Sequence, residues 1–387
     1  MTDVPTPAGI YIHFPFCQAR CNYCSFVSFP FDTNAVSAYT GSLESEISLW
    51  SRAYGALSPH QTRLFDSIYI GGGTPSIVDA SYWEPVLDLL NRGFNIANDA
   101  EITIEGNPGS INRSKAKSWR SLGINRISLG AQSFHDTELA AMGRSHRSKD
   151  ITSAFGILRQ EGFHNISMDL LIGYPAQTLD SVRKSLESIF ICRPDHVSVY
   201  LLEIKSGASM EKLFSSGELV PLDEDLSADM YELVCCEMMG QGYEQYEISN
   251  FCKPGFEAVH NMKYWIDGFY LGIGAGAHGR LDDVRYSNFQ NMTKYADRLS
   301  RSEFPWESQV ELNPRTRMVE ALLMGLRLNR GVDLIGIGQR YSMDVRKFVS
   351  DRLEGLEEYG LFEFRGDILR LTDRGRLVSN TVLERLL

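Results

Sequence analysis

Three cysteines near the start of the sequence have the spacing of metal-cluster ligands. Cys17, Cys21 and Cys24 form a C-x3-C-x2-C pattern on a loop that follows the apolar run at residues 9–14. Three thiolates on one loop can each bind one iron of a [4Fe–4S] cluster, and the fourth iron then lacks a protein ligand. Zinc normally takes four ligands, and only one C-x2-C pair is present here. The spacing therefore favours an iron–sulfur cluster over zinc or three unrelated buried cysteines.

An iron atom with an open coordination site can bind a small molecule. The amine and carboxylate of S-adenosylmethionine can chelate such an iron, which places the sulfonium beside the cluster. One electron from a low-potential donor then cleaves the carbon–sulfur bond and yields a 5′-deoxyadenosyl radical. Because the cofactors supply this chemistry, the protein's task is to position and shield them.

Further polar and glycine-rich positions follow the apolar runs. Residues 71–75 (GGGTP) come after the second run, where glycines let the backbone approach a ligand closely. Glu105 ends the third run, Gln132 follows the fourth, and Asp169 lies inside the fifth. All lie at or near carboxyl ends of predicted strands, where barrel enzymes place their sites. The alternatives are an ordinary turn for the glycines and a partnered structural carboxylate for Asp169.

The elements that must hold these residues alternate regularly. Short apolar runs bounded by Gly, Pro or Asn predict buried strands, and the amphipathic stretches at 35–54 and 180–190 predict helices between them. Strict alternation predicts parallel strands joined by crossovers, and therefore an α/β protein with a partial (β/α)6 TIM-like barrel. The predicted strands cover residues 9–14, 65–72, 100–107, 125–130, 165–173 and 196–202.

The rest of the chain is expected to form two smaller parts. We predict a core barrel over 1–240, an extension over 241–305 and a small winged-helix-like domain over 306–387. The polar segment 299–317 looks like a boundary, and two short strands around residues 365–367 (RGD) resemble a wing.

Composition narrows the possible partners and the compartment. The chain carries 38 Lys and Arg against 49 Asp and Glu, a net charge of −11. A DNA-binding regulator that uses the wing is therefore disfavoured, and we expect no nucleic acid partner. We find no apolar stretch long enough to span a membrane and no secretory signal. We expect a cytoplasmic protein.

Several motifs resemble one family of the radical SAM superfamily. Residues 11–17 (YIHFPFC), the GGGTP loop, 130–134 (GAQSF), 143–146 (GRSH) and 169–173 (DLLIG) are similar to signatures of the oxygen-independent coproporphyrinogen III oxidase family. The resemblance covers nearly the whole chain. It implies that S-adenosylmethionine contacts Tyr11, Tyr23, Gly72, Gly73, Thr74, Glu105, Gln132, Arg144 and Asp169.

Two features separate the branches of that family. The true oxidases continue the loop with a fourth cysteine, whereas Ser25 and Phe26 follow Cys24 here, and only sixteen residues precede Cys17. Residues 260–265 (HNMKYW) instead match the H-N-x-x-Y-W motif of HemW-type heme chaperones. That resemblance implies heme binding and delivery of heme to acceptors such as respiratory enzymes, with the inner face of a membrane as one expected place of transfer.

The H-N-x-x-Y-W motif has a physical rationale for heme. His260 can offer a neutral imidazole nitrogen to the iron, and Tyr264 and Trp265 can stack on the macrocycle. The alternative is that His260 satisfies buried backbone groups and Trp265 belongs to the core. The runner-up function is a coproporphyrinogen III oxidase, in which the radical abstracts hydrogen from propionate side chains that then lose carbon dioxide.

Overall fold

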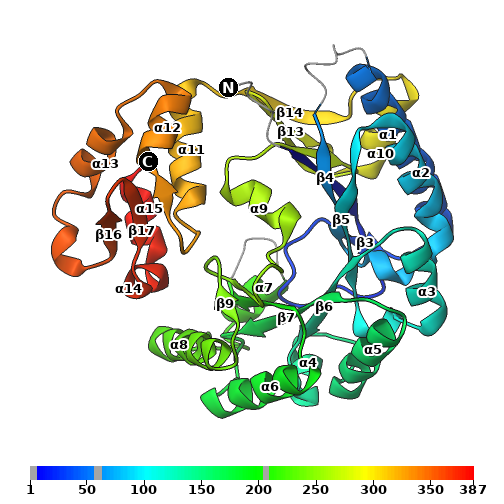
Figure 1. Ribbon diagram of the computed structural model, residues 1–387. Helices are drawn as coiled ribbons and strands as arrows, with labels where there is room; N and C mark the ends of the chain where they lie inside the picture. The colour runs from blue at the N-terminus through cyan, green and yellow to red at the C-terminus, as the bar shows by residue number, and fades with distance from the viewer. Residues whose placement is uncertain (1–6, 56–62, 204–208) are drawn as a thin grey trace.

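The protein was analysed as a computed structural model that describes residues 7–55, 63–203 and 209–387. Neighbouring parallel strands, in chain order, form the main body (Figure 1). The predicted partial (β/α)6 barrel is therefore confirmed, and every predicted strand overlaps an observed one. These strands are β1 (Ala8–Phe14), β4 (Phe65–Gly72), β5 (Ile96–Gly106), β6 (Arg126–Gln132), β7 (Asn165–Ile172) and β8 (His196–Leu201).

Helices cover the outside of these strands, as the crossovers of a parallel sheet require. The predicted helices at 35–54 and 180–190 correspond to α1 (Thr33–Gly55) and α6 (Leu179–Cys192). No helix in the described ranges is both long and apolar enough to cross a membrane. The outer helices are α1 (Thr33–Gly55), α2 (Glu84–Gly93), α3 (Arg113–Ser121), α4 (Asp136–Ala141), α5 (Ser148–Gln160), α6 (Leu179–Cys192) and α8 (Glu224–Gly240), with the short α7 (Ser209–Ser215) before the last.

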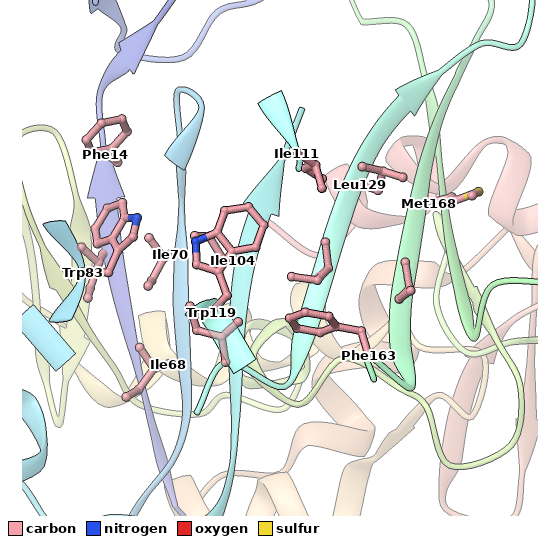
Figure 2. Packing of buried hydrophobic residues seen from close by; sticks show 14 of the residues in the cluster. Phe14, Ile68, Ile70, Trp83, Ile104, Ile111, Trp119, Leu129, Phe163 and Met168 are labelled. Atoms are coloured by element: carbon pink, nitrogen blue, oxygen red, sulfur yellow. The ribbon is translucent and has the colours of Figure 1, made fainter. Parts of the chain in front are cut away.

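Alternation along the strands separates an apolar face from a polar one. In β1, Ile10 and Ile12 are fully buried on the helix side, whereas Tyr11 and His13 face the barrel interior. Burying such an isoleucine contributes about 1.5–3 kcal/mol. Figure 2 shows further residues of this apolar layer, among them Ile68, Trp83 and Trp119. The outer apolar layer stabilises the barrel and leaves its interior free for polar groups.

The chain after residue 240 extends both edges of the sheet. On one edge, β10 (Asn250–Cys252) is antiparallel to β8 and pairs with β9 (Glu244–Gln245). On the other, β11 (Tyr270–Ile273) is parallel to β1. Beyond β11 follow β12 (His278–Leu281), β13 (Val284–Asn288) and β14 (Trp306–Glu311), with α9 (Val259–Trp265) and α10 (Met292–Ser300) between strands. The predicted domain boundaries after residues 240 and 305 stay predictions. The strand β14, which lies just after the second boundary, belongs to the main sheet.

A second apolar core lies in the C-terminal part of the chain. The hairpin of β16 (Phe362–Arg365) and β17 (Ile368–Leu371) turns at residues 365–367 and is followed by helices, as the winged-helix interpretation predicted. Asp267 links this part to the main body because its carboxylate accepts hydrogen bonds from Arg280 of β12 and from Arg340 and Tyr341 of α12. The elements are α11 (Pro314–Gly325), β15 (Val332–Asp333), α12 (Leu334–Tyr341), α13 (Val345–Leu353), β16 (Phe362–Arg365), β17 (Ile368–Leu371), α14 (Asp373–Leu377) and α15 (Ser379–Arg385).

A buried carboxylate joins α1 to the segments around β11 and β13. Glu46 is fully buried and accepts hydrogen bonds from the Gly274 amide (2.8 Å), the Asn288 side chain (2.7 Å) and the Tyr295 hydroxyl (2.6 Å). Burial raises the pKa of Glu46 to about 7, and these donors oppose the rise.

Replacing this carboxylate should weaken the fold. Glu46→Ala leaves three buried donors without their acceptor, so the free energy of unfolding should fall by about 3 kcal/mol. Urea unfolding followed by circular dichroism measures the change. The control Glu44→Ala lies on the same helix outside this cluster and should shift the midpoint little. Equal midpoints for both variants would contradict the assignment.

Candidate functional site

The three cysteines lie on one loop, and a pair of short strands joins the two ends of this loop. Cys17 ends β2 (Phe16–Cys17), which pairs with β3 (Phe29–Pro30) on the far side of the loop. Cys17, Cys21 and Cys24 are half-buried free thiols, and burial raises the pKa of Cys17 and Cys24. A cationic partner would favour the deprotonated form of Cys17 and Cys24 against this effect of burial.

The glycine loop packs directly on the backbone that carries Cys17. The Gly73 amide donates to the Phe14 carbonyl (2.7 Å) and the Thr74 amide to the Phe16 carbonyl (2.8 Å). A Cβ on Gly73 would lie 2.5 Å from the Phe16 oxygen, so only glycine allows this approach. Gly72 has φ +114°, a conformation that side chains rarely adopt. The Thr74 hydroxyl lies 3.5 Å from the Cys17 sulfur.

Arg144 connects the cysteine loop to the end of β6. Its Nη1 lies 3.3 Å from the Cys21 sulfur and 3.5 Å from the Tyr23 hydroxyl, while Nη2 donates to the Gly130 carbonyl (2.9 Å). Gln132 has φ +67°, and a Cβ added at Gly130 would meet the ends of both the Gln132 and Arg144 side chains. The positive guanidinium beside Cys21 would stabilise a thiolate or a negatively charged cluster.

Glu105 reaches from the end of β5 to the glycine loop. Its carboxylate accepts hydrogen bonds from the Tyr69 hydroxyl (2.9 Å) and the Gly72 amide (3.0 Å). Burial raises the pKa of Glu105 to about 7, and the nearby carboxylate of Asp169 contributes to the rise. A cationic group placed here would restore the ionised form.

Asp169 points into the barrel and has local partners. The Ser128 hydroxyl lies 3.2 Å from both carboxylate oxygens, and the Ser167 hydroxyl lies 3.5 Å from one of them. Burial raises its pKa. These long contacts are consistent with a partnered structural carboxylate, and ligand binding by Asp169 stays a prediction.

Tyr11 pairs with Tyr69 and through it with the level of Thr103, two residues before Glu105 in β5. Its hydroxyl bonds to Nδ1 of His13 (2.8 Å), and His13 Nε2 bonds to the Val27 carbonyl of the cysteine loop (3.1 Å). Tyr11 thus supports the loop through His13.

One of the three thiols, that of Cys21, lines a small cavity together with polar side chains of the neighbouring loops. Cys21, Thr74, Asn107 and Arg144 are among the residues that line it. Within the described ranges, no three His, Cys, Asp or Glu side chains converge as a single metal ion requires. A [4Fe–4S] cluster needs no such convergence because each thiolate binds a different iron. The donor set therefore fits a cluster, with Thr74 and Arg144 as donors to its sulfur ligands.

His260 lies at the opposite end of the barrel. The backbone amides of Val259 and His260 donate to Glu101 (3.0 and 3.1 Å), so this carboxylate holds the start of α9 beneath the amino ends of the strands. The imidazole is 1% exposed, with Nδ1 bonded to Ser67 (3.1 Å) and Nε2 to Tyr264 (3.1 Å). Both ring nitrogens are thus occupied by side-chain hydroxyls, whereas the structural alternative expected buried backbone groups as partners. Heme contact by His260 stays a prediction that needs the Tyr264 hydroxyl to be displaced.

The sequence analysis did not identify the buried polar side chains that fill the barrel at the amino ends of its strands. Glu101 and Arg126 are buried at 3.8 Å from each other below Glu105, and His196 bonds to Ser167 and Tyr246. A signal was available for Glu101, because residues 101, 103 and 105 alternate with isoleucines and must share a face of β5. The same signal was available for Arg126, which shares a face of β6 with Ser128, and for His196, which shares a face of β8 with Ser198.

A parallel barrel with a three-cysteine loop at the carboxyl ends of its strands is the architecture of radical S-adenosylmethionine proteins. The family model for the Radical SAM superfamily matches residues 11–189, and that for the HemN C-terminal domain matches 312–378. The solved structure of the coproporphyrinogen III oxidase HemN from Escherichia coli matches with a TM-score of 0.86 at 22% identity, over 99% of this chain and 90% of that one. At this identity the likeness shows the fold.

Full-length relatives define the family. The heme chaperone HemW of Bacillus subtilis is 33% identical over 96% of this chain and 97% of its own length. The Mycobacterium tuberculosis protein of the same name is 33% identical over 98% and 95%, respectively. A mitochondrial radical S-adenosyl methionine domain-containing protein 1 of Bos taurus is 31% identical over 84% and 74%. The chain therefore belongs to the HemW heme chaperone family of the radical SAM superfamily.

The close approach at Gly73 can be tested directly. Gly73→Ala should push the glycine loop from the cysteine loop and break the hydrogen bonds to Phe14 and Phe16, because the added Cβ meets a backbone oxygen. Hydrogen exchange of the amides at 73 and 74 should accelerate by about tenfold or more. Gly156→Ala on α5 meets no atom within 4 Å and should leave these amides unchanged. Unchanged protection in Gly73→Ala would refute the packing.

Proposed function

We propose that this protein binds one [4Fe–4S] cluster, S-adenosylmethionine and heme, and delivers heme to acceptor proteins such as membrane-associated respiratory enzymes. It acts in the cytoplasm and at the inner face of a membrane, and a low-potential donor reduces its cluster. The observation that carries this proposal is the similarity, over nearly the full length, to proteins named heme chaperone HemW.

The residues at the carboxyl ends of the strands suit the two cofactors. Cys17, Cys21 and Cys24 would hold three irons, and the open iron supplies reductive cleavage of S-adenosylmethionine when that cofactor is bound. Glu105 offers a buried carboxylate beside the Gly72 amide, where a cationic amine would be attracted. Arg144 places positive charge at Cys21. Tyr23, Gly73, Thr74, Gln132 and Asp169 complete the proposed contacts, with Tyr11 behind them.

Phe26, which stands at the position of that fourth cysteine, argues against coproporphyrinogen III oxidation as the main activity. The true oxidases carry a further cysteine in this loop, which this chain lacks. Retention of the S-adenosylmethionine site without that cysteine is compatible with a protein whose radical chemistry is not directed at porphyrinogen propionates.

A paired assay tests the function. Anaerobically reconstituted protein should bind hemin in a stoichiometric titration and transfer it to an apo-acceptor, such as a heme-free respiratory subunit. The same preparation should not convert coproporphyrinogen III to protoporphyrinogen with turnover when reductant and S-adenosylmethionine are present. Multiple turnovers in that assay, or failure to bind hemin, would overturn the chaperone proposal.

The cluster has its own test. Cys21→Ser should reduce the content of iron and acid-labile sulfide several-fold, because it removes the thiolate beside Arg144. Cys236→Ser is a matched control, because Cys236 is exposed on α8. This variant should keep its full content of iron and sulfide. Iron and sulfide analysis with electron paramagnetic resonance of the reduced protein gives the readout. Full cluster content in Cys21→Ser would remove the cluster from the proposal.

A further inference from the structure

Basic side chains gather beside the cysteine loop, although the whole chain is acidic. Residues 18–28, 107–117 and 141–149 contain seven Lys and Arg and no Asp or Glu, whereas the full sequence has 38 Lys and Arg against 49 Asp and Glu. These segments therefore depart in sign from the overall charge of −11. The seven are Arg20, Arg113, Lys115, Lys117, Arg144, Arg147 and Lys149.

Hydrogen bonds and packing bring the three segments together. The Asn22 side chain of the cysteine loop donates to the Ala141 carbonyl (2.9 Å). A Cβ added at Gly109 would lie 3.6 Å from the Cβ of His146, so the turn after β5 packs on the turn before α5. Residues of all three segments line the small cavity that Cys21 borders. The positive charges therefore gather at one place beside the cysteine loop.

Three of the seven cations form what we call the basic face. Arg20, Arg147 and Lys149 are exposed, and they lie on the two segments that the Asn22 hydrogen bond joins. Arg20 Nη2 donates to the Cys24 carbonyl (3.2 Å), which holds this charge against the cysteine loop. The half-buried Arg144 adds a further positive charge at the same loop.

Acidic side chains offset this charge only in part. Arg113 and Lys115 of α3 lie within ion-pair distance of acids from outside the three segments. Asp136 and Asp150 accept hydrogen bonds from backbone amides at the start of α5 (2.8 Å each), and Asp136 opposes the charges of Arg147 and Lys149. The seven cations nevertheless outnumber the acids that contact them. The basic face can therefore attract an acidic partner.

The position of this face suits the entry of electrons. Cys17, Cys21 and Cys24 are half-buried, whereas the neighbouring residues 18–20 and 25–26 are exposed. A cluster on these thiols would therefore lie just beneath the surface. Electron transfer weakens steeply with distance, so a donor protein must dock where the cluster is nearest to solvent. Encounters between electron carriers bury little surface, and complementary charge speeds them.

We propose that the basic face is the docking surface for a small acidic protein that carries single electrons, such as a flavodoxin. This inference rests on the proposed cluster, and it adds the class of donor protein and the place where that protein binds. The anionic flavin hydroquinone gives up one electron and becomes the neutral semiquinone. The cluster takes up this electron and passes from the 2+ to the 1+ state, and no proton moves.

The salt dependence of electron transfer discriminates this surface from the charge of the whole chain. Two acidic proteins repel each other, and salt screens the repulsion, so a rate governed by net charge would rise with ionic strength. Docking on the basic face reverses the sign, because salt then screens an attraction. The rate constant with an acidic flavodoxin should therefore fall by about tenfold or more between low and high salt.

Stopped-flow mixing of the reconstituted full-length protein with flavodoxin hydroquinone measures this rate constant through the absorbance of the semiquinone. Arg147→Glu combined with Lys149→Glu should lower the rate constant at low salt by about tenfold, and added salt should reduce the difference. Acidic side chains are favourable at a helix N-terminus, so this double variant should fold. Circular dichroism and iron analysis establish that it is folded and contains its cluster.

A matched control reverses two charges far from the cysteine loop. Arg346→Glu combined with Lys347→Glu makes the same change in net charge in the first turn of α13, where both residues are exposed. This control should stay within about twofold of the unaltered protein. Photoreduced 5-deazariboflavin, a small uncharged donor, should reduce the cluster of all three proteins at the same rate.

The outcomes separate the docking surface from the proposed function. If the unaltered protein holds no cluster that deazariboflavin reduces, the proposed cluster fails and the docking surface fails with it. If the cluster is reduced but the double variant at 147 and 149 reacts with flavodoxin as fast as the control, the surface is refuted while the function stands. A rate constant of the unaltered protein that rises with salt would also refute it. DNA binding that this double variant abolishes, at an unchanged flavodoxin rate, would reassign the face to nucleic acid.

Discussion

Polar groups can be buried inside a parallel barrel only if each finds a partner or a ligand, and this constraint organises the protein. An unpaired carboxylate or amide in the interior costs several kcal/mol. Glu101, Glu105 and Glu46 all satisfy the constraint by accepting hydrogen bonds from segments distant in the sequence. Each carboxylate thereby determines where another element lies. The polar interior thus positions the surrounding loops and α9 as well as providing a binding surface.

The barrel uses its two ends differently. At the carboxyl ends of the strands, the cysteine loop, the glycine loop and Arg144 meet, and the groups there are half-buried and only loosely partnered. At the amino ends, α9 closes the barrel, and His260 is bonded on both ring nitrogens. Side chains with free hydrogen-bonding capacity can bind a cofactor, whereas a network of fully hydrogen-bonded side chains makes the structure around it rigid. The carboxyl ends of the strands can therefore bind a ligand, whereas α9 covers the amino ends.

The C-terminal part of the chain gives α9 a second role. Its first residues plug the barrel through Glu101, and its last residue, Trp265, lines a cavity between α9 and the C-terminal part of the chain. Asp267, two residues further, binds Arg280 of the main sheet and Arg340 of α12. A single short segment therefore connects the barrel end to the cavity and to the second core. This arrangement explains why, within the motif at residues 260–265, His260 is buried while Trp265 borders a cavity.

The sequence by itself determined the local and periodic features. Short apolar runs bounded by Gly, Pro or Asn predicted the strands, and amphipathic stretches predicted helices such as α1 and α6. The spacing of Cys17, Cys21 and Cys24 placed the donors on one loop. The carboxyl ends of the strands were predictable as a meeting place because parallel strands align there. Only the tertiary structure decided that α9 closes the far end of the barrel, that β14 joins the main sheet and that a cavity separates Trp265 from the C-terminal core. The physical reason is sequence distance: the bond from the His260 amide to Glu101 spans 159 residues. Local propensity carries no information about a contact of that kind.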